Sequence, residues 1–414
     1  MQQLFQKDIQ YYKFCFYGFF KNLRFFEPFL ILFFLEKNIT FLQIGIIYST
    51  REVLINILEI PSGILADIFG RKKTLIISFF FYITSFAMFF FTHSFFSFLL
   101  AISFYAIGDS FRSGNHKTMI FEYLRIHGWN DQRAHYYGHT RSWSQFGSAI
   151  SSLIAAAIVF YSGNYQSIFI ISVIPYILDL ILISSYPREL DKSIESQNIS
   201  SVKSGFKQII NEFTLSLKNP SILRAVANLS IHSGFHRSIK DYLQPVIQSL
   251  AISLPVFLYY TDTQRSSILI GIIYFIVYIL TSLTTRKAGY LKDRIQSTSK
   301  ALNITMFMGF ILALISGIFY HYGFFLVSII FYILIYLIEN LRNPIGVGYV
   351  SELYQDHILS TALSLNSQSK SLLAAIFAPI LGFIADYFGV GIALAGLSFF
   401  IIIAGPFFTV KPSK

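Results

Sequence analysis

Charged side chains lie inside long apolar stretches of this chain, where their burial costs free energy unless they serve a purpose. The first such stretch carries Lys21, Arg24 and Glu27, and the two cations, three residues apart, share one face of a helix. An ionisable group at membrane depth costs at least ~2.5–3.5 kcal/mol on insertion scales, so each one marks a candidate functional group. Groups of the same kind recur at Asp109, Arg112, His116, Arg237, Lys240, Asp241, Glu339 and Arg342.

Two kinds of chemistry fit these residues, and the sequence leaves both open. In the first, cations converge on an aqueous cavity and bind an anion, because a guanidinium can donate two parallel hydrogen bonds to a carboxylate or phosphate. The candidate anion-binding residues are Lys21, Arg24, Arg112, His116, Arg237, Lys240 and Arg342. In the second, each cation pairs with a nearby acid, since a buried charge without a partner is costly. The expected pairs are Arg24 with Glu27, Arg112 with Asp109, Arg342 with Glu339 and Lys240 with Asp241.

Acids in such stretches can also bind and release protons. The candidates for proton binding are Glu27, Asp109, Asp241 and Glu339. His232 and His236 are four residues apart, as metal ligands on a helix can be, but spacing supplies no third ligand. We therefore expect no metal site and no cofactor. Asp179 is a lone acid in another apolar stretch, and the sequence identifies no partner for it.

The composition indicates a helical membrane protein. The chain has 414 residues, of which 54% are hydrophobic and only 13% are charged, whereas a soluble domain carries about 25% charged residues. Its apolar residues recur in stretches of roughly 20, enough for ~30 Å of helix and one crossing of a bilayer. The single cysteine, Cys15, excludes an intramolecular disulfide and a cysteine-based metal site. No cleavage site of a secretory signal peptide follows the first apolar stretch, so we expect that stretch to remain.

The apolar stretches predict twelve transmembrane helices. They lie at roughly 11–35, 41–63, 74–92, 96–122, 138–161, 165–186, 222–247, 266–288, 301–319, 322–348, 368–387 and 390–409. Connections assigned to the cytoplasm are rich in Lys and Arg, whereas those assigned outside hold only Lys37 and Arg265. This bias places both termini in the cytoplasm. The net charge of +11 therefore reflects membrane orientation and predicts no nucleic-acid partner.

The chain repeats itself once. The run Ile44–Tyr48 recurs as Ile270–Tyr274, a shift of 226 (270−44), and the same shift carries Gly63 onto Gly289 and Asp67 onto Asp293. A polar stretch separates the two copies. The predicted domains are an N-terminal six-helix bundle (1–186), a cytoplasmic linker (187–221) and a C-terminal six-helix bundle (222–414). Two parallel repeats of this kind place a substrate site between the halves, near the middle of the bilayer.

One short loop carries a family resemblance. The pattern Gly63-x-Leu65-Ala66-Asp67-x-x-Gly70-Arg71-Lys72 resembles the signature loop between helices 2 and 3 of the major facilitator superfamily, and Gly289 to Arg294 resembles its weaker second copy. A segment of helix 4, from Ser113 to Leu124, is similar to bacterial drug or uncharacterised permeases of that superfamily. The resemblance covers essentially the whole chain and implies that helices 1, 4, 7 and 10 line a central cavity.

The loop residues predict a gate at the cytoplasmic side. Glycines permit close helix approach and sharp turns, and Asp67 can face the loop cations or the amino end of a helix. Such contacts would hold the halves together while the site faces outward. The candidate gating residues are Gly63, Asp67, Gly70, Arg71, Lys72, Gly289, Asp293 and Arg294.

Together these features predict a transporter of the cytoplasmic membrane. We expect a monomeric, proton-coupled carrier that moves a small organic solute by alternating access, with anionic solutes favoured. The alternative within this class is a multidrug–proton antiporter, although many buried cations argue against a broad drug site. The alternative outside it is a receptor or scaffold that has lost transport. An enzyme is not expected, because the chain has no nucleophile elbow, no H-E-x-x-H and no phosphate-binding glycine loop.

Overall fold

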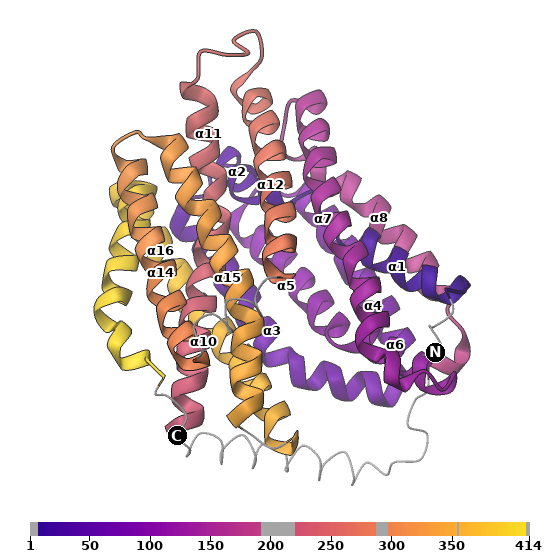
Figure 1. Ribbon diagram of the computed structural model, residues 1–414. Helices are drawn as coiled ribbons and strands as arrows, with labels where there is room; N and C mark the ends of the chain where they lie inside the picture. The colour runs from indigo at the N-terminus through magenta and orange to yellow at the C-terminus, as the bar shows by residue number, and fades with distance from the viewer. Residues whose placement is uncertain (1–6, 192–219, 287–296, 354–355, 411–414) are drawn as a thin grey trace. The chain divides into compact units, whose positions relative to one another are not determined.

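The computed structural model describes residues 7–191, 220–286, 297–353 and 356–410. All regular secondary structure within these ranges is helical, which confirms the predicted all-α class. Gly289, Asp293 and Arg294, the second copy of the loop, lie outside the described residues. Figure 1 shows the helices with the labels used below.

The helices of the first half of the chain follow the predicted order. They are α1 (Ile9–Lys21), η1 (Glu27–Phe29), α2 (Leu30–Glu36), α3 (Phe41–Phe69), α4 (Arg71–Phe91), α5 (Phe95–Arg112), α6 (Asn115–Ile126), η2 (Asn130–Gln132), α7 (Arg133–Ser162), α8 (Ser167–Ser184) and η3 (Arg188–Leu190).

The second half has a similar sequence of elements. They are α10 (Pro220–Ile239), η4 (Lys240–Tyr242), α11 (Leu243–Ser253), α12 (Asp262–Arg286), α14 (Thr298–His321), α15 (Phe325–Leu353), α16 (Asp356–Ala404) and η5 (Gly405–Phe408). The long helix α16 bends at Gly389, where φ is 84°.

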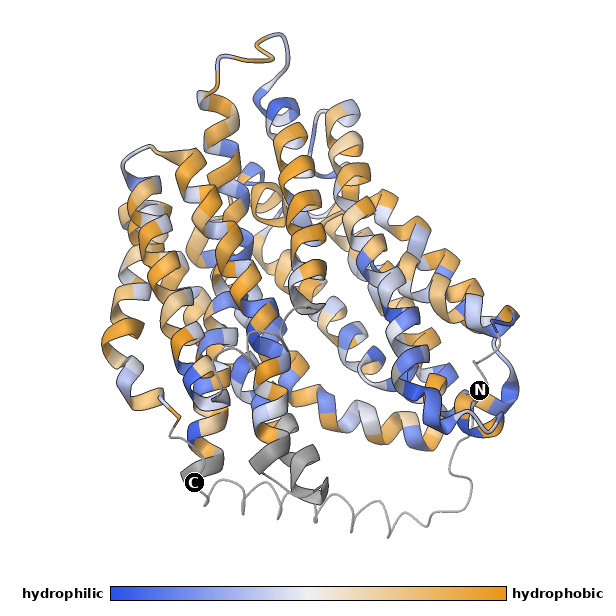
Figure 2. Ribbon diagram, viewed as in Figure 1, coloured by the Kyte–Doolittle hydropathy of each residue, from blue (hydrophilic) through white to orange (hydrophobic). Residues whose placement is uncertain are grey.

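Helical residues overlap each of the twelve predicted spans, and the apolar surface runs along them (Figure 2). Within the described residues, eight helical stretches are long and apolar enough to cross a membrane. The number of twelve spans and the cytoplasmic position of both termini stay predictions. Several helices extend beyond the predicted ranges, as α3 does by continuing to Phe69.

Two of the predicted spans are broken at corresponding places. The first helix ends at Lys21 and resumes at η1, and the seventh is interrupted by the 3-10 turn η4. Each break frees main-chain carbonyl groups, which tyrosines satisfy: Tyr176 Oη donates to the Lys21 carbonyl at 3.4 Å, and Tyr336 Oη donates to the Lys240 carbonyl at 2.7 Å. Breaks of this kind are tolerated at membrane depth only where protein or water satisfies the backbone.

The predicted loop between α3 and α4 is a turn at one residue, Gly70. Its φ of 99° is open to glycine but strained for other residues, and a Cβ atom there would collide with the carboxylate of Asp191. Gly63, by contrast, lies inside α3, and a Cβ atom there would meet nothing within 4 Å. The prediction that Gly63 permits close helix approach is therefore wrong for this structure.

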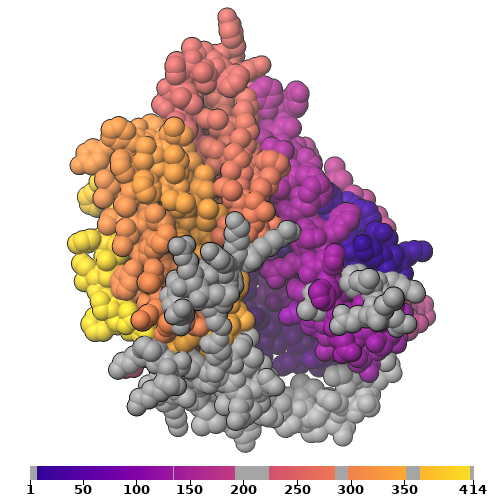
Figure 3. Space-filling model, in the orientation of Figure 1, coloured from indigo at the N-terminus to yellow at the C-terminus, as the bar shows by residue number. Residues whose placement is uncertain are grey.

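The helices form two compact units, each with its own core. Unit 1 comprises residues 1–33, 54–198 and 263–278, and unit 2 comprises 34–53, 199–262 and 279–414. The core of unit 1 is largely aromatic, as where Phe89 stacks on Phe169 with ring centroids 4.9 Å apart. In unit 2, α14 packs along α15. In the space-filling view, the orange atoms of this part of the chain form one continuous surface (Figure 3).

Each unit contains a helix segment from the other half of the sequence. In unit 2, Gly45 of α3 packs directly on the main chain of Ala378 in α16. In unit 1, Gly271 of α12 packs directly on the Ala156 side chain of α7. Gly45 and Gly271 are the repeat-related pair of the sequence, so the same close contact occurs once in each unit.

Candidate functional site

Unit 1 holds a cavity of about 230 Å³ whose wall is rich in cations. It is lined by Phe14, Tyr17, Gly18, Lys21, Asn22, Arg112, Gly114, His116, Lys117, Ile120, Tyr137, Thr140, Arg141 and Ser144. These residues come from α1, α6, α7, the end of α5 and the residues that flank these helices. Four of them are Lys or Arg, and no Asp or Glu is among them. The wall therefore offers charge complementarity to an anion.

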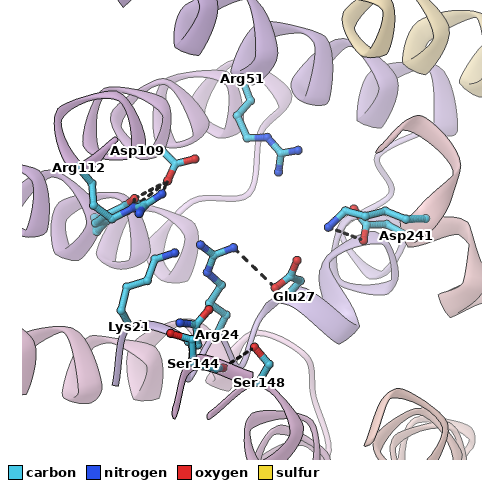
Figure 4. Close-up of polar contacts among 12 residues, drawn as sticks. Lys21, Arg24, Glu27, Arg51, Asp109, Arg112, Ser144, Ser148 and Asp241 are labelled. Carbon is cyan, nitrogen blue, oxygen red and sulfur yellow. Dashed lines mark hydrogen bonds and ion pairs between the residues drawn. The ribbon is translucent and has the colours of Figure 1, made fainter. Parts of the chain in front are cut away.

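Lys21 stands at the last residue of α1 and reaches this cavity. A close fit between α1 and α7 positions it, because a Cβ atom on Gly18 would lie 2.7 Å from Ser144 Oγ and one on Gly147 would lie 2.6 Å from the Phe19 carbonyl. Lys21 is only 8% exposed, and its ammonium group makes no hydrogen bond or ion pair within the described structure. In Figure 4 it points toward Arg24 and the Asp109–Arg112 pair.

Arg112 also lines the cavity, but it is anchored. Its Nη2 atom lies 2.9 Å from Asp109 Oδ1, and the Tyr82 hydroxyl donates to the same oxygen at 2.7 Å. The pair confirms the partner that the i, i+3 spacing predicted. Tyr82, from α4, was not identified from the sequence, because a tyrosine among the aromatic residues of α4 carries no distinguishing pattern.

Arg24 pairs with Glu27, as predicted, at 3.8 Å between Arg24 Nη1 and Glu27 Oε2 (Figure 4). Both residues lie at the break between α1 and α2. Arg24 is absent from the lining of the cavity. Arg24 therefore adds positive charge near Lys21 but does not line the cavity of unit 1.

His116 forms one side of the cavity through ring contacts. Its ring stacks on Tyr17 with centroids 3.6 Å apart, and its Nε2 atom lies 3.1 Å from the Tyr186 hydroxyl. The turn at Gly114, with φ of 74°, separates α5 from α6 and sets the direction in which α6 presents His116. The arrangement gives the cavity an aromatic wall beside its cations.

Two predicted cations of unit 2 are paired. Arg237 Nη1 lies 2.8 Å from Glu52 Oε2, and its guanidinium also donates to Ser371 Oγ at 2.9 Å. Glu52 accepts a second bond from Arg51 Nη2 at 2.9 Å. Lys240 and Asp241 form the predicted pair at 3.7 Å (Figure 4).

The predicted pair between Arg342 and Glu339 is wrong, because each residue has other partners. Arg342 is 1% exposed and donates to the carbonyls of Leu302 and Asn228, and to Thr305 Oγ1 at 3.0 Å. Glu339 instead lies 2.8 Å from His232 Nδ1. Sequence spacing gave these residues adjacent positions on α15, but packing turned them toward different neighbours.

His232, whose spacing from His236 would suit metal ligands, instead contacts the Glu339 carboxylate. Ser233 Oγ donates to the other oxygen of Glu339 at 2.7 Å, so this carboxylate is held from both sides. His236 packs edge-on against Tyr336, with ring centroids 5.0 Å apart. Among the described residues, no group of three His, Cys, Asp or Glu side chains could hold a metal ion.

The first copy of the loop is held together by its own charges. Arg71 Nη2 lies 2.6 Å from Asp67 Oδ1, which confirms that Asp67 faces a loop cation. The Lys72 amide donates to Asp191 Oδ1 at 2.9 Å, and Lys72 Nζ donates to the Tyr186 carbonyl at 2.7 Å. The loop is therefore tied to the segment that follows α8.

Asp179 of α8 has an unusual environment for a carboxyl group. Its side chain is 0% exposed, and neither of its oxygens has a hydrogen-bond partner. Among the carboxyl groups that the structure describes, only this one has both oxygens buried and unsatisfied. Its isolation in an apolar stretch was visible in the sequence, but its neighbours were not.

Comparison with known proteins gives matches along nearly the whole chain. Residues 14–367 match the family model of the Major Facilitator Superfamily. A protein of Bacillus subtilis (strain 168), the uncharacterized MFS-type transporter YxaM, is 27% identical over 399 residues, which cover 94% of this chain and 92% of that protein.

Solved structures show the same fold at lower identity. A mutant of the nucleoside transporter NupG superposes with a TM-score of 0.77 at 15% identity, covering 97% of this chain and 99% of that one. A POT family transporter in complex with 5-aminolevulinic acid gives a TM-score of 0.74 at 16% identity, covering 98% and 97%.

Proposed function

We propose that this chain, which belongs to the Major Facilitator Superfamily and is a multi-pass transporter of the cytoplasmic membrane, carries a small organic anion by alternating access. The observation that supports this most is the cavity of unit 1, with four Lys or Arg side chains and no acid in its lining. A volume of about 230 Å³ is below the ~300–1,000 Å³ of pockets for drug-sized ligands. It suits a small solute better than a large one.

Lys21 is the central residue of this proposal. An ammonium group that is 8% exposed and has no partner within the described structure is costly, and an anion in the cavity would remove that cost. Arg112 would add a second cation whose direction is fixed by Asp109 and Tyr82. His116 and Tyr17 would offer an aromatic surface to the organic part of the solute.

The other predicted anion-binding cations enter the proposal differently. Arg24, Arg237 and Lys240 each hold an acid in this conformation, so they would act on the solute only if those pairs opened. Both terminal nitrogens of the Arg342 guanidinium donate to protein oxygens, which favours a structural role. The proposed site therefore rests on Lys21, Arg112 and His116.

We also propose that transport is coupled to protons. The acids that the sequence put forward, Glu27, Asp109, Asp241 and Glu339, each have a cation or histidine partner. A proton carrier must therefore be one of these acids after its pair opens, or an acid that has no partner. The Asp67–Arg71 pair is proposed as part of the cytoplasmic gate.

A binding screen tests the proposed substrate class. Purified protein is heated with benzoate, succinate and phosphate as anions, uridine as a neutral solute, and tetraphenylphosphonium as a cation. A ligand at 100 times its Kd adds about 2.7 kcal/mol of stability, which raises the unfolding temperature by several degrees for a large domain. We expect stabilisation by at least one organic anion.

The same screen with variants locates the site. Lys21→Met should abolish the shift given by the anion, whereas the matched control Lys300→Met, at an exposed position of α14, should keep it. Stabilisation by tetraphenylphosphonium alone would overturn the anion proposal and favour a drug antiporter. A shift that survives in Lys21→Met would place the anion elsewhere.

A further inference from the structure

We propose that Asp179 binds the coupling proton, and that Lys21 is shared between the Asp179 carboxylate and the transported anion. In the anion-bound form Lys21 faces the cavity and Asp179 is protonated. When Asp179 loses its proton, it pairs with Lys21 and the anion is released. The proposal that Lys21 is shared depends on the proposed anion site. The proposal that Asp179 is protonated does not depend on any substrate.

The burial of Asp179 argues that it is neutral in this conformation. An ionised carboxylate that has lost water needs hydrogen bonds or a close cation, because burial without them costs several kcal/mol. Both Asp179 oxygens are buried, and among the residues that the structure describes they have no hydrogen-bond partner and no cation in an ion pair. Binding a proton removes the charge and with it most of that cost.

Lys21 is the cation near enough to take part. It interacts electrostatically with Asp179. Tyr176, one turn before Asp179 on α8, donates its hydroxyl to the Lys21 carbonyl at 3.4 Å, which places the two helices in contact at this level. Since the Lys21 side chain is flexible and makes no other bond, a change of its rotamer would let it reach either partner.

The remaining titratable groups around Asp179 are mostly tyrosines. Tyr17 on α1 and Tyr186 beyond the end of α8 are close enough to interact with it electrostatically, without a hydrogen bond in the described structure. The helices packed against α8 contribute Tyr82 on α4, which is bonded to Asp109, and Tyr136 on α7, which interacts with Tyr186. His116 reaches the same region through the Tyr186 hydroxyl. None of these groups offers Asp179 a positive charge to replace Lys21.

The charges of unit 1 then link the proton to the anion. If all five side chains are ionised, Lys21, Arg24 and Arg112 contribute +3 and Glu27 and Asp109 contribute −2, so the cluster has a net charge of +1 (3−2) when Asp179 is protonated. It is neutral when Asp179 is ionised. Because an anion is held better by the positive cluster, anion binding favours proton binding, and by linkage the reverse also holds. No bond other than the O–H bond of Asp179 forms or breaks, and Lys21 keeps its protons.

Infrared difference spectra of the full-length protein in lipid nanodiscs test the proton on Asp179. Spectra recorded across a pH series should show the carbonyl stretch of a protonated carboxyl group that persists at neutral pH. We expect this band to be lost in Asp179→Asn. It should remain in the matched control Glu122→Gln, which removes an acid paired with Arg125 near the end of α6. A band that persists in Asp179→Asn would overturn the proposal.

Variants of Lys21 test the sharing. Lys21→Met removes the cation that stabilises the ionised form, so the pH at which the band disappears should rise by about one unit or more. Lys21→Arg should restore a midpoint near that of the unmodified protein. An unchanged midpoint in Lys21→Met would overturn the sharing of Lys21. If the band behaves as expected but no anion stabilises the protein, the substrate proposal fails and the proton site stands.

Discussion

Asp386 of α16 caps the amino end of α3, and its removal should shift the equilibrium between conformations. Its Oδ1 and Oδ2 atoms accept hydrogen bonds from the Phe41 and Leu42 amides, each at 2.8 Å. A carboxylate at a helix amino terminus satisfies free N–H groups and favours the positive end of the helix dipole. We expect this contact between segments of the two sequence halves to form in one conformation of the proposed alternating-access cycle and to break in the other.

The expected size of the effect follows from the exposure of the contact. Two charge-assisted hydrogen bonds would contribute more if they were buried, but Asp386 is exposed. The range for a helix cap, about 0.5–2 kcal/mol, is therefore appropriate. A loss in this range changes an equilibrium by roughly 2- to 30-fold. Asp386→Ala should lower, by that factor, the population of the conformation with this contact formed relative to the conformation with it broken.

Spin labels can measure this ratio because the chain has a single cysteine, Cys15, which Cys15→Ser removes. Labels at Ile46→Cys and Phe383→Cys, which are 36% and 48% exposed, lie beside the contact. The fraction of spins with dipolar broadening should fall in Asp386→Ala. It should not change in the control Asp131→Ala, an exposed acid of η2. Equal broadening in Asp386→Ala and the unmodified protein would refute the role of this cap.

Two further predictions concern the loop and the core of unit 2. Asp67→Ala breaks a partly exposed ion pair, which is worth about 0–1 kcal/mol, so the protein should still fold. Proteoliposomes that contain this variant should take up a stabilising anion more slowly than those with the unmodified protein. Uptake at the normal rate would contradict the gating role of Asp67. Arg342→Leu leaves the buried oxygens of Asn228 and Thr305 without their donor and should cost about 3–5 kcal/mol of stability. Thermal unfolding measures this loss of stability, and Arg125→Leu, at an exposed position, is the control. Equal losses of stability in the two variants would show that the hydrogen bonds of Arg342 contribute little.

Local geometry explains what could be predicted from the sequence. The pair Asp109–Arg112 formed as expected because residues three apart on a helix are neighbours wherever that helix packs. Arg24 and Glu27 lie at the break between α1 and α2, and they also pair because they are only three residues apart along the chain. The all-α class followed in the same way from the length of the apolar stretches. The repeat was equally visible, since Gly45 and Gly271 occupy equivalent close contacts in the two units.

Contacts between distant residues could not be predicted in this way. Glu52 with Arg237 and His232 with Glu339 join residues that are 185 and 107 positions apart. The same limit explains the error at Arg342, whose spacing from Glu339 was suitable but whose side chain is directed by packing toward Asn228.

The sequence by itself therefore determined the class of the protein and three of the four predicted short-range charge pairs, because chain proximity and the cost of burial act locally. Only the tertiary structure decided the surroundings of Lys21 and Asp179. Within the part of the chain that the structure describes, packing leaves the Lys21 ammonium at a cavity and the Asp179 carboxyl without a hydrogen bond. These surroundings depend on how α1, α7 and α8 pack against one another, and this packing cannot be inferred from the spacing of residues along the chain.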